Sequence, residues 1–236
     1  MTVGILQCGE PPEALRAEHG SYGAMMQKLL GAGRDTATYD VTAGALPATA
    51  TACDAYVLTG SPAGVYEGLP WIPGLIRFLQ SARGRAKLVG VCFGHQAMAQ
   101  AFGGQVIKSP EGWGIGVQRY HVRHRAPWMD DAGEVRVPAS HQDQVVVCPP
   151  GARVTADNAF TPYAGLDYGG AISFQFHPEF TPEFGTALVE YRRDKYGVGA
   201  DTAAASYGGP NDCARVGGWI SRFLDAPELQ RGDGKA

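Results

Sequence analysis

The sequence predicts an α/β fold with a doubly wound, mostly parallel sheet and an added antiparallel segment. Three observations support this prediction. Up to residue 104, short apolar runs alternate with segments of helical periodicity, as in βαβ units. The run Ala86–Val91 (AKLVGV) is almost continuously apolar, which is typical of a parallel strand buried on both faces. Beyond residue 104 the rhythm changes to short alternating segments, which indicate antiparallel strands.

The first half of the chain supplies the parallel core. The β-branched and apolar runs predict strands at Thr2–Cys8, Thr36–Val41, Ala55–Thr59 and Ala86–Val91. Helical spacing predicts helices at Tyr22–Leu30, Trp71–Ala82 and Gly94–Phe102. Each helix has a glycine within two residues of its end, as helix C-termini commonly do.

The second half is more mixed. Four segments between residues 105 and 147 (QVI, GVQRYHV, EVRV and QVVV) predict antiparallel strands that cover one side of the sheet. Later segments predict a core strand at Ala171–Phe176, helices at Pro182–Tyr196 and Val216–Leu224, and a loop at Ala200–Asn211. The polar tail after about residue 226 is expected to fray. With no internal repeat and no clear linker, we expect one domain over 1–236.

Composition excludes several classes of protein. The net charge of −3 gives no general attraction to nucleic acid or to an anionic membrane. No apolar run approaches the length of a membrane span, and the first residues do not have the pattern of a signal peptide. The five cysteines are odd in number and widely spaced, without a Cys-x-x-Cys pair, so neither a disulfide framework nor a zinc site is expected. A reducing cytoplasm fits this pattern best.

The segment Gly90–Gly94 (GVCFG) is the most informative part of the sequence. It follows a predicted buried strand and precedes a predicted helix, which is the context of a nucleophile elbow with Cys92 as the nucleophile. A helix N-terminus favours a thiolate. The backbone N–H of Phe93 would face the developing oxyanion, a contribution of about 3–4 kcal/mol to the barrier. The alternative is a buried structural cysteine between packing glycines.

A base for this nucleophile is expected at the end of the strand Ala171–Phe176. His177, Pro178 and Glu179 follow that strand, so they should lie at the same carboxyl edge of the sheet as Cys92. His177 would act as base and Glu179 would orient its ring. The alternative is a strand-ending turn with a surface histidine and glutamate.

A second oxyanion donor is expected from the loop Gly60-Ser61-Pro62, which follows the strand Ala55–Thr59. A simple Gly/Pro turn would explain the same residues. His95 is expected to cap or pack its helix rather than to react. No Walker or dinucleotide loop is present, so no nucleotide site, metal or other cofactor is expected.

In this order, these pieces resemble the class I glutamine amidotransferase family, and most closely stand-alone members similar to the amidotransferase domain of GMP synthase. The resemblance extends over nearly the whole chain and rests on GSPAGVYE (60–67), GVCFGHQ (90–96), GGQV (103–106), SHQDQV (140–145) and HPEF (177–180). It implies a flavodoxin-like fold and a Cys92–His177–Glu179 triad that hydrolyses the γ-amide of glutamine through a γ-glutamyl thioester.

The resemblance also assigns supporting roles. Backbone N–H groups of Phe93 and of the Gly60-Ser61 loop would bind the oxyanion, and Gln96 would help hold the substrate. A further set would lie near the amino-acid end of the substrate: Ser140, His141, Gln142 and Asp143. The family loop is commonly Gly-Gly-Pro, so Ser61 is tolerable only if its φ is negative.

Several functions stay open. Because the sequence holds no synthetase domain, a partner synthase acting in trans is expected to receive the ammonia. The main alternative is a hydrolase of γ-glutamyl peptides or amides, with the same chemistry and a larger leaving group. A non-catalytic regulatory or binding subunit on the same scaffold is a different class of function. A generic esterase is disfavoured, because its triad acid would normally precede the histidine at a distance.

Overall fold

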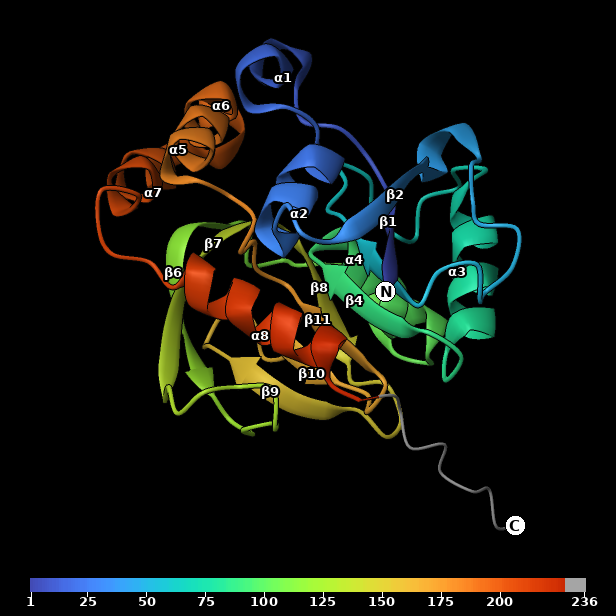
Figure 1. Cartoon of the computed structure of the whole chain (residues 1–236). Helices are drawn as coiled ribbons and strands as arrows, with labels where there is room; N and C mark the ends of the chain where they lie inside the picture. The colour runs from blue at the N-terminus through green and yellow to red at the C-terminus, as the bar shows by residue number, and fades with distance from the viewer. Residues whose placement is uncertain (228–236) are drawn as a thin grey trace.

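The computed structural model describes residues 1–227 and contains a large mixed sheet flanked by helices (Figure 1). The predicted polar tail lies almost entirely outside the described residues. The strands are β1 Thr2–Gln7, β2 Asp35–Asp40, β3 Ala55–Leu58, β4 Lys87–Val91, β5 Gln105–Lys108, β6 Gly114–Val122, β7 Glu134–His141, β8 Asp143–Val147, β9 Arg153–Asp157, β10 Gly165–Asp167 and β11 Ala171–Phe174. The helices are α1 Glu13–His19, α2 Tyr22–Leu30, α3 Ile72–Ala82, α4 Phe93–Ala101, α5 Pro182–Tyr191, α6 Arg193–Tyr196, α7 Ala200–Ser206 and α8 Cys213–Asp225.

The main sheet has the strand order β2-β1-β3-β4-β11-β10-β9-β6-β7. The pairs from β2 to β11 are parallel, and the pairs from β11 to β7 are antiparallel. This arrangement confirms the predicted α/β class, with a mostly parallel core and an antiparallel extension. Within the described part of the chain, no helix is both long and apolar enough to cross a membrane.

Helices cover both faces of the parallel core because neighbouring strand residues point to opposite faces. On β3, Val57 packs into the cluster that contains residues of α2 and α8, whereas Leu58 packs into the cluster with α3 and α4. Val89 and Leu88 on β4 divide in the same way. Figure 1 shows α8 crossing one face, where Trp219 is fully buried. The parallel strands are therefore packed between two apolar layers, one on each face.

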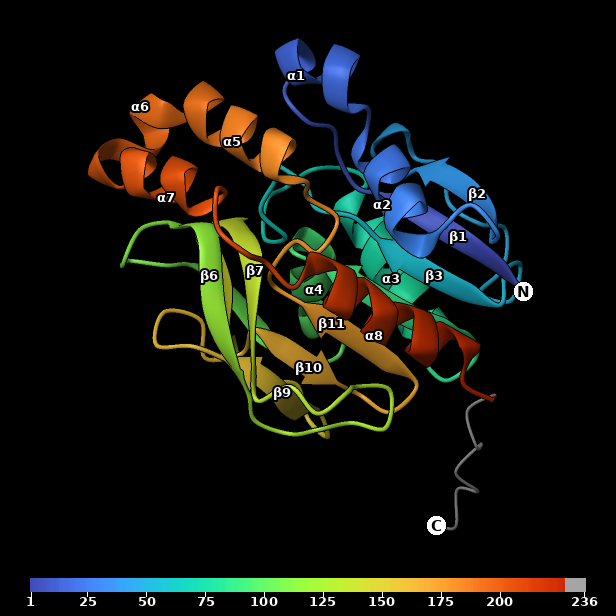
Figure 2. The ribbon, with the colours of Figure 1, turned by 60° about the vertical axis from the view of Figure 1, so that its left-hand side comes forward.

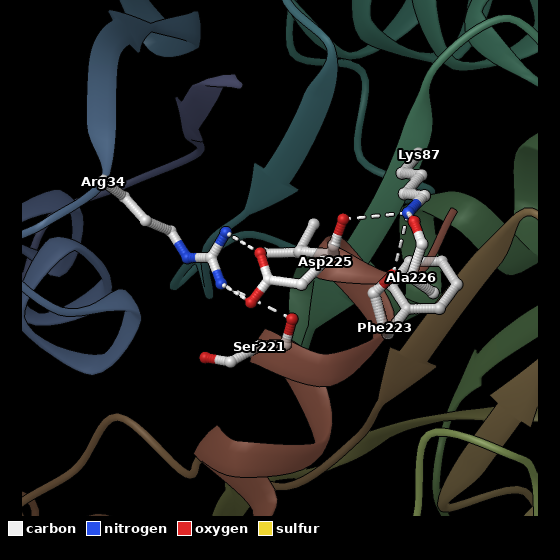
Figure 3. Close-up of polar contacts among 7 residues, drawn as sticks. Arg34, Lys87, Ser221, Phe223, Asp225 and Ala226 are labelled. Carbon is white, nitrogen blue, oxygen red and sulfur yellow. Dashed lines mark hydrogen bonds and ion pairs between the residues drawn. The ribbon is translucent and has the colours of Figure 1, made fainter. Parts of the chain in front are cut away.

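The end of α8 is fastened to the first half of the chain (Figure 3). Arg34 donates to both carboxylate oxygens of Asp225 at 2.8 Å. Lys87 Nζ donates to the carbonyl oxygens of Phe223 at 3.0 Å and Leu224 at 2.8 Å, and also to that of Ala226. These carbonyls lie at the helix C-terminus, where a cation is favoured and where the last helix turn lacks internal donors. The buried ammonium of Lys87 therefore caps the C-terminus of α8. Lys87 is the first residue of β4, so this cap lies at the edge of the sheet opposite to the one where β3 and β4 end.

Four parts of the fold differ from the sequence-based expectation. Of the four segments expected to cover one side of the sheet, β6 and β7 instead extend the main sheet, and β5 pairs with β8 in a separate two-stranded sheet. The short strands β9 and β10 and the helix α1 were not predicted. The predicted helix Pro182–Tyr196 is broken at Arg192, which has φ −103° and ψ 15°.

The segment predicted as the loop Ala200–Asn211 is also wrong in its first part, because Ala200–Ser206 forms helix α7. Alanine has the highest helix propensity, and tertiary packing completes the helix. Gly116 on β6 allows this contact, since a Cβ at Gly116 would lie 2.8 Å from Cα of Ala203. Figure 2 shows α5, α6 and α7 gathered beside α1, next to one end of β6 and β7. This group of helices borders the edge of the sheet that carries the candidate site.

Candidate active site

Cys92 occupies a strained turn between β4 and α4. It has φ 51° and ψ −103°, and within residues 1–227 it is the only non-glycine residue with a positive φ. Such a conformation costs about 1–3 kcal/mol and persists only where the surroundings enforce it. The Cys92 N–H donates to the carbonyl of Phe174 on β11 at 2.8 Å, which fixes the turn to the neighbouring strand. The sequence-predicted elbow is thus present in the backbone.

The glycines that flank Cys92 are required by close contacts. A Cβ at Gly90 would lie 2.6 Å from the carbonyl carbon of Gly94. A Cβ at Gly94 would lie 2.6 Å from Cβ of Leu58 on β3. Contacts this short are incompatible with a side chain. The GVCFG pattern therefore reflects packing of α4 against β3 and β4, and this packing holds Cys92 at the edge of the sheet.

His177 and Glu179 form a buried hydrogen-bonded pair at the same edge. His177 Nδ1 and Glu179 Oε1 are 2.7 Å apart, and both side chains are almost fully buried. The backbone N–H of His177 donates to the carbonyl of Pro138 on β7 at 2.8 Å. The His177 ring stacks on Phe180, with ring centroids 4.0 Å apart. Three contacts thus fix the imidazole in place.

The electrostatics of His177 favour its protonated form. Burial by itself lowers the pKa of His177, but the charges of Glu179 and Cys92 outweigh burial and raise that pKa to about 10. Nε2 of His177 is buried without a well-aligned hydrogen bond, and Cys92 is close enough to act on its charge. A histidine whose protonated form is favoured beside a thiol is suited to accept the thiol proton, which leaves a thiolate next to an imidazolium, and to give that proton up later.

The loop after β3 completes the edge. A Cβ at Gly60 would lie 3.1 Å from Cε1 of His177 and 3.8 Å from Cβ of Cys92, so Gly60 faces both side chains and leaves no room there for a side chain of its own. Ser61 does not have a positive φ, and its Oγ accepts a hydrogen bond from the Ala63 N–H at 3.1 Å. Serine is therefore accommodated without backbone strain where a second glycine is common. Phe93 is the first residue of α4, with its side chain fully buried.

The structure brings Gln96 into contact with the segment Ser140–Asp143, but it uses several of these side chains internally. Gln96 Nε2 donates to the Asp143 carbonyl at 2.9 Å and to Gln175 Oε1 at 3.1 Å. His141 Nδ1 lies 3.2 Å from the Asp143 carbonyl oxygen. The Gln142 amide donates to the Ser109 carbonyl at 3.3 Å. Gln96 and His141 are buried, so they position the backbone around Asp143.

The side chains of Ser140 and Asp143 are less enclosed. Asp143 Oδ1 accepts a hydrogen bond from the Tyr66 hydroxyl at 2.9 Å, and Tyr66 is 52% exposed. Burial raises the pKa of Asp143, and the hydrogen bond from Tyr66 opposes that shift. Ser140 Oγ lies 2.7 Å from the Tyr196 hydroxyl. Within Ser140–Asp143, the side chains of Ser140 and Asp143 thus pair with tyrosine hydroxyls, whereas those of His141 and Gln142 pair with backbone carbonyls.

Two histidines near the elbow are neutral packing residues in this arrangement. His95 is fully buried, with Nδ1 2.8 Å from Ser173 Oγ. Burial lowers the pKa of His95 to about 3, and burial likewise lowers the pKa of His141 to about 3. Among the described hydrogen bonds, neither ring is joined to Cys92. His95 thus packs its helix against β11, in agreement with the expectation from the sequence.

Sequence reasoning missed Phe180, Arg192 and Tyr196 as neighbours of the site. Phe180 was visible as the last letter of HPEF, and its role is to stack on the His177 ring. Arg192 Nη1 donates to Ser140 Oγ at 3.3 Å and to the Tyr196 hydroxyl at 3.4 Å. No pattern in the sequence could indicate this, because Arg192 was expected within an unbroken helix.

Comparison with known proteins gives one family. The sequence model described as glutamine amidotransferase class-I matches residues 23–191. A glutamine amidotransferase-like protein of Schizosaccharomyces pombe is 28% identical over 210 residues, which are 81% of this chain and 84% of that protein. GMP synthase (glutamine-hydrolyzing) of Thermus thermophilus is 36% identical over 152 residues, which are 62% of this chain but 29% of that protein.

Two further comparisons bear on activity and fold. Gamma-glutamyl peptidase 3 of Arabidopsis thaliana is 27% identical over 146 residues, which are 58% of this chain and 59% of that protein. The crystal structure of a glutamine amidotransferase from Thermotoga maritima superposes with a TM-score of 0.78 over 95% of this chain and 99% of that one. At 18% identity, this second likeness supports the fold alone.

Proposed function

The chain belongs to the class I glutamine amidotransferase family, and from this premise we propose that it hydrolyses the γ-amide of glutamine through a γ-glutamyl thioester on Cys92. His177 would be the base and Glu179 its orienting carboxylate. The family consists of amide hydrolases and amidotransferases. A cysteine beside a buried histidine–glutamate pair is an arrangement suited to such chemistry. The observation that carries the proposal is the position of Gly60, where an added Cβ would lie within 4 Å of both Cys92 and His177, so that the two side chains meet at one edge of the sheet.

Acylation of the enzyme would proceed as follows. His177 takes the proton of the Cys92 thiol, and the thiolate attacks the γ-carbonyl carbon of the substrate. The oxyanion of the tetrahedral intermediate accepts hydrogen bonds from the backbone N–H groups of Phe93 and Ser61, an arrangement that contributes about 3–4 kcal/mol per donor. Protonated His177 then gives its proton to the amide nitrogen. The C–N bond breaks, ammonia leaves and the thioester remains.

Hydrolysis of the thioester would use the same groups. A water molecule enters the place of ammonia, and His177 takes one of its protons as its oxygen attacks the carbonyl carbon. Collapse of the second tetrahedral intermediate breaks the C–S bond, and His177 returns the proton to Cys92. Glutamate leaves and the free enzyme is restored. Throughout, Glu179 keeps the Nδ1 proton on His177 so that Nε2 faces the reaction.

A second candidate is a hydrolase of γ-glutamyl peptides or amides, which the similarity to gamma-glutamyl peptidase 3 favours. The bond-breaking steps would be identical, and only the leaving amine would be larger. Glutamate release from glutamine and from a γ-glutamyl dipeptide separates the two. Release mainly from glutamine supports the amidotransferase-type glutaminase, and release only from the dipeptide supports the peptide hydrolase.

We further propose that, if glutamine is the substrate, a synthase supplied as a separate chain receives the ammonia. In the Thermus thermophilus GMP synthase the matching region is 29% of the protein, so the family domain occurs there beside other sequence. Release from neither substrate, with Cys92 still open to alkylation, would instead indicate a site that a partner must complete or a non-catalytic scaffold.

A further inference from the structure

Arg192 carries a half-buried positive charge without an acidic partner. It lies at the break between α5 and α6, where its guanidinium donates only to the hydroxyls of Ser140 and Tyr196. Within the described residues, no carboxylate lies within ion-pair distance of it. The next residue, Arg193, is fully paired with Glu190 at 2.7 Å and Asp201 at 2.5 Å. A guanidinium has five donors, so Arg192 retains donors for a further acceptor.

The position of Arg192 places this charge beside the candidate active site. Ser140 is two residues beyond Pro138 on β7, and the Pro138 carbonyl accepts the His177 N–H at 2.8 Å. Residues two apart on a strand are about 7 Å apart, so Ser140 lies near the backbone carbonyl that anchors His177. Burial lowers the pKa of Arg192, but nearby Tyr196, Tyr22 and Cys92 outweigh it and raise that pKa, which keeps the group charged.

Two further lysines lie in the electrostatic neighbourhood of Arg192, namely Lys195 and Lys108. Lys195 lies over the Trp113 ring, with Nζ 4.7 Å from the ring centroid. Burial lowers the pKa of Lys195, and the positive charges of Arg192 and Lys108 lower it further. Asp143 is the acidic group that acts on Lys195 in the opposite direction. A cluster of three cations attracts an anion to the break between α5 and α6.

We propose that Arg192 binds a carboxylate of the substrate, with the Ser140 and Tyr196 hydroxyls holding the guanidinium in position. The inference deepens the proposed function and rests on it for the substrate class. A γ-glutamyl compound offers such a group in two places. One is the α-carboxylate of the glutamyl moiety, which every substrate has. The other is the C-terminal carboxylate of a peptide leaving group, which glutamine lacks. Arginine suits either, because its planar fork matches a carboxylate.

The kinetic test compares Arg192→Gln and Arg192→Lys with a control, Arg193→Gln, on three substrates: glutamine, γ-glutamylglycine and γ-glutamylglycinamide. Loss of a charge-assisted hydrogen bond should lower kcat/KM of Arg192→Gln by about ten- to a hundredfold, mainly through KM. An equal loss on all three substrates assigns Arg192 to the α-carboxylate. A loss confined to γ-glutamylglycine assigns it to the leaving group. Arg192→Lys should recover part of the loss.

An unchanged kcat/KM for Arg192→Gln on every substrate that the protein turns over would overturn the proposal. So would an equal loss in Arg193→Gln, because the effect would then not depend on the unpaired charge. Thermal unfolding of each variant shows whether the fold is retained. Since Arg193 pairs with acidic side chains on the surface, its replacement should leave turnover within about twofold of the parent.

A second test does not depend on turnover. Alkylation rates of Cys92 are measured with iodoacetate, which carries a carboxylate, and with iodoacetamide, which does not. Arg192→Gln should slow iodoacetate several-fold more than iodoacetamide. Equal slowing of both reagents, or none, would contradict carboxylate binding. If no γ-glutamyl compound is hydrolysed but the iodoacetate effect is present, the proposed function fails while the anion site stands.

Discussion

Replacing Glu179 with glutamine tests how the His177 ring is controlled. The Nδ1–Oε1 distance of 2.7 Å and the burial of both side chains describe a charge-assisted hydrogen bond. Such a bond contributes about 1.5–3 kcal/mol against about 0.5–1.5 for a neutral one. The glutamine oxygen can still accept from Nδ1, so the difference is about 1–2 kcal/mol. Glu179→Gln should therefore lower kcat/KM by about five- to thirtyfold.

The pH dependence of Glu179→Gln gives a sharper signature than its rate. Burial lowers the pKa of His177, and Glu179 is the foremost of the charges that raise it to about 10. Without that carboxylate the His177 pKa falls, so the imidazolium that protonates the leaving group is lost at lower pH. The alkaline limb of the kcat/KM profile should move to lower pH.

The assay for this prediction is glutamate release from whichever γ-glutamyl substrate is hydrolysed, measured across pH with thermal unfolding as a check of the fold. Glu183→Gln is a matched control, because Glu183 is exposed at the start of α5. Its rate and profile should match those of the parent. A Glu179→Gln variant with an unchanged rate and an unchanged alkaline limb would refute the assigned role of the carboxylate. Loss of rate without a shift of the limb would indicate disturbed packing instead.

Gly60→Ala would place a Cβ 3.1 Å from the Cε1 of His177, so the ring must shift, and kcat should fall by about tenfold or more. Gly68→Ala, where nothing lies within 4 Å of the added Cβ, should not change kcat, and equal kcat values for both variants would contradict the packing argument. Burial lowers the pKa values of His95 and His141 to about 3, so between pH 6.5 and 3 the unfolded state binds more protons and stability falls as the pH falls. Urea unfolding between pH 6 and 4 should give a slope of about 1.4 kcal/mol per pH unit for each histidine. Replacing either histidine by glutamine should remove one such contribution. A slope unchanged by both replacements would show that these rings are not the source.

The sequence predicts the first half of the fold closely because its signals are local. The continuous apolar run before Cys92 and the glycines after each helix determine strand and helix ends to within about two residues. The strand β10 is only three residues long, Gly165–Asp167, and its state depends on the partners β9 and β11 rather than on its own pattern. Helix α7 depends in the same way on the space above Gly116. Short elements of this kind are determined by tertiary contacts.

The candidate site likewise contains residues that local sequence signals place and residues that only tertiary contacts place. Cys92, His177 and Glu179 could be placed together from the sequence, since each follows a predicted parallel strand and the carboxyl ends of such strands meet at one edge. The internal use of Gln96 and His141 could not be foreseen, because their partners are backbone groups brought close by the fold. Arg192 was hidden for a related reason. Its lack of an acidic partner depends on which residues surround it in space. The sequence does not distinguish it from the adjacent Arg193, which does have acidic partners.

The role of Cys92 as nucleophile is tested most sharply by trapping the covalent intermediate. The protein is mixed with glutamine or a γ-glutamyl dipeptide and quenched in acid within the first turnovers, and its mass is measured before and after peptide mapping. We expect one γ-glutamyl group on the peptide that contains Cys92, and we expect neither adduct nor glutamate release in Cys92→Ala. Sustained glutamate release by Cys92→Ala, with the fold intact, would contradict the central claim.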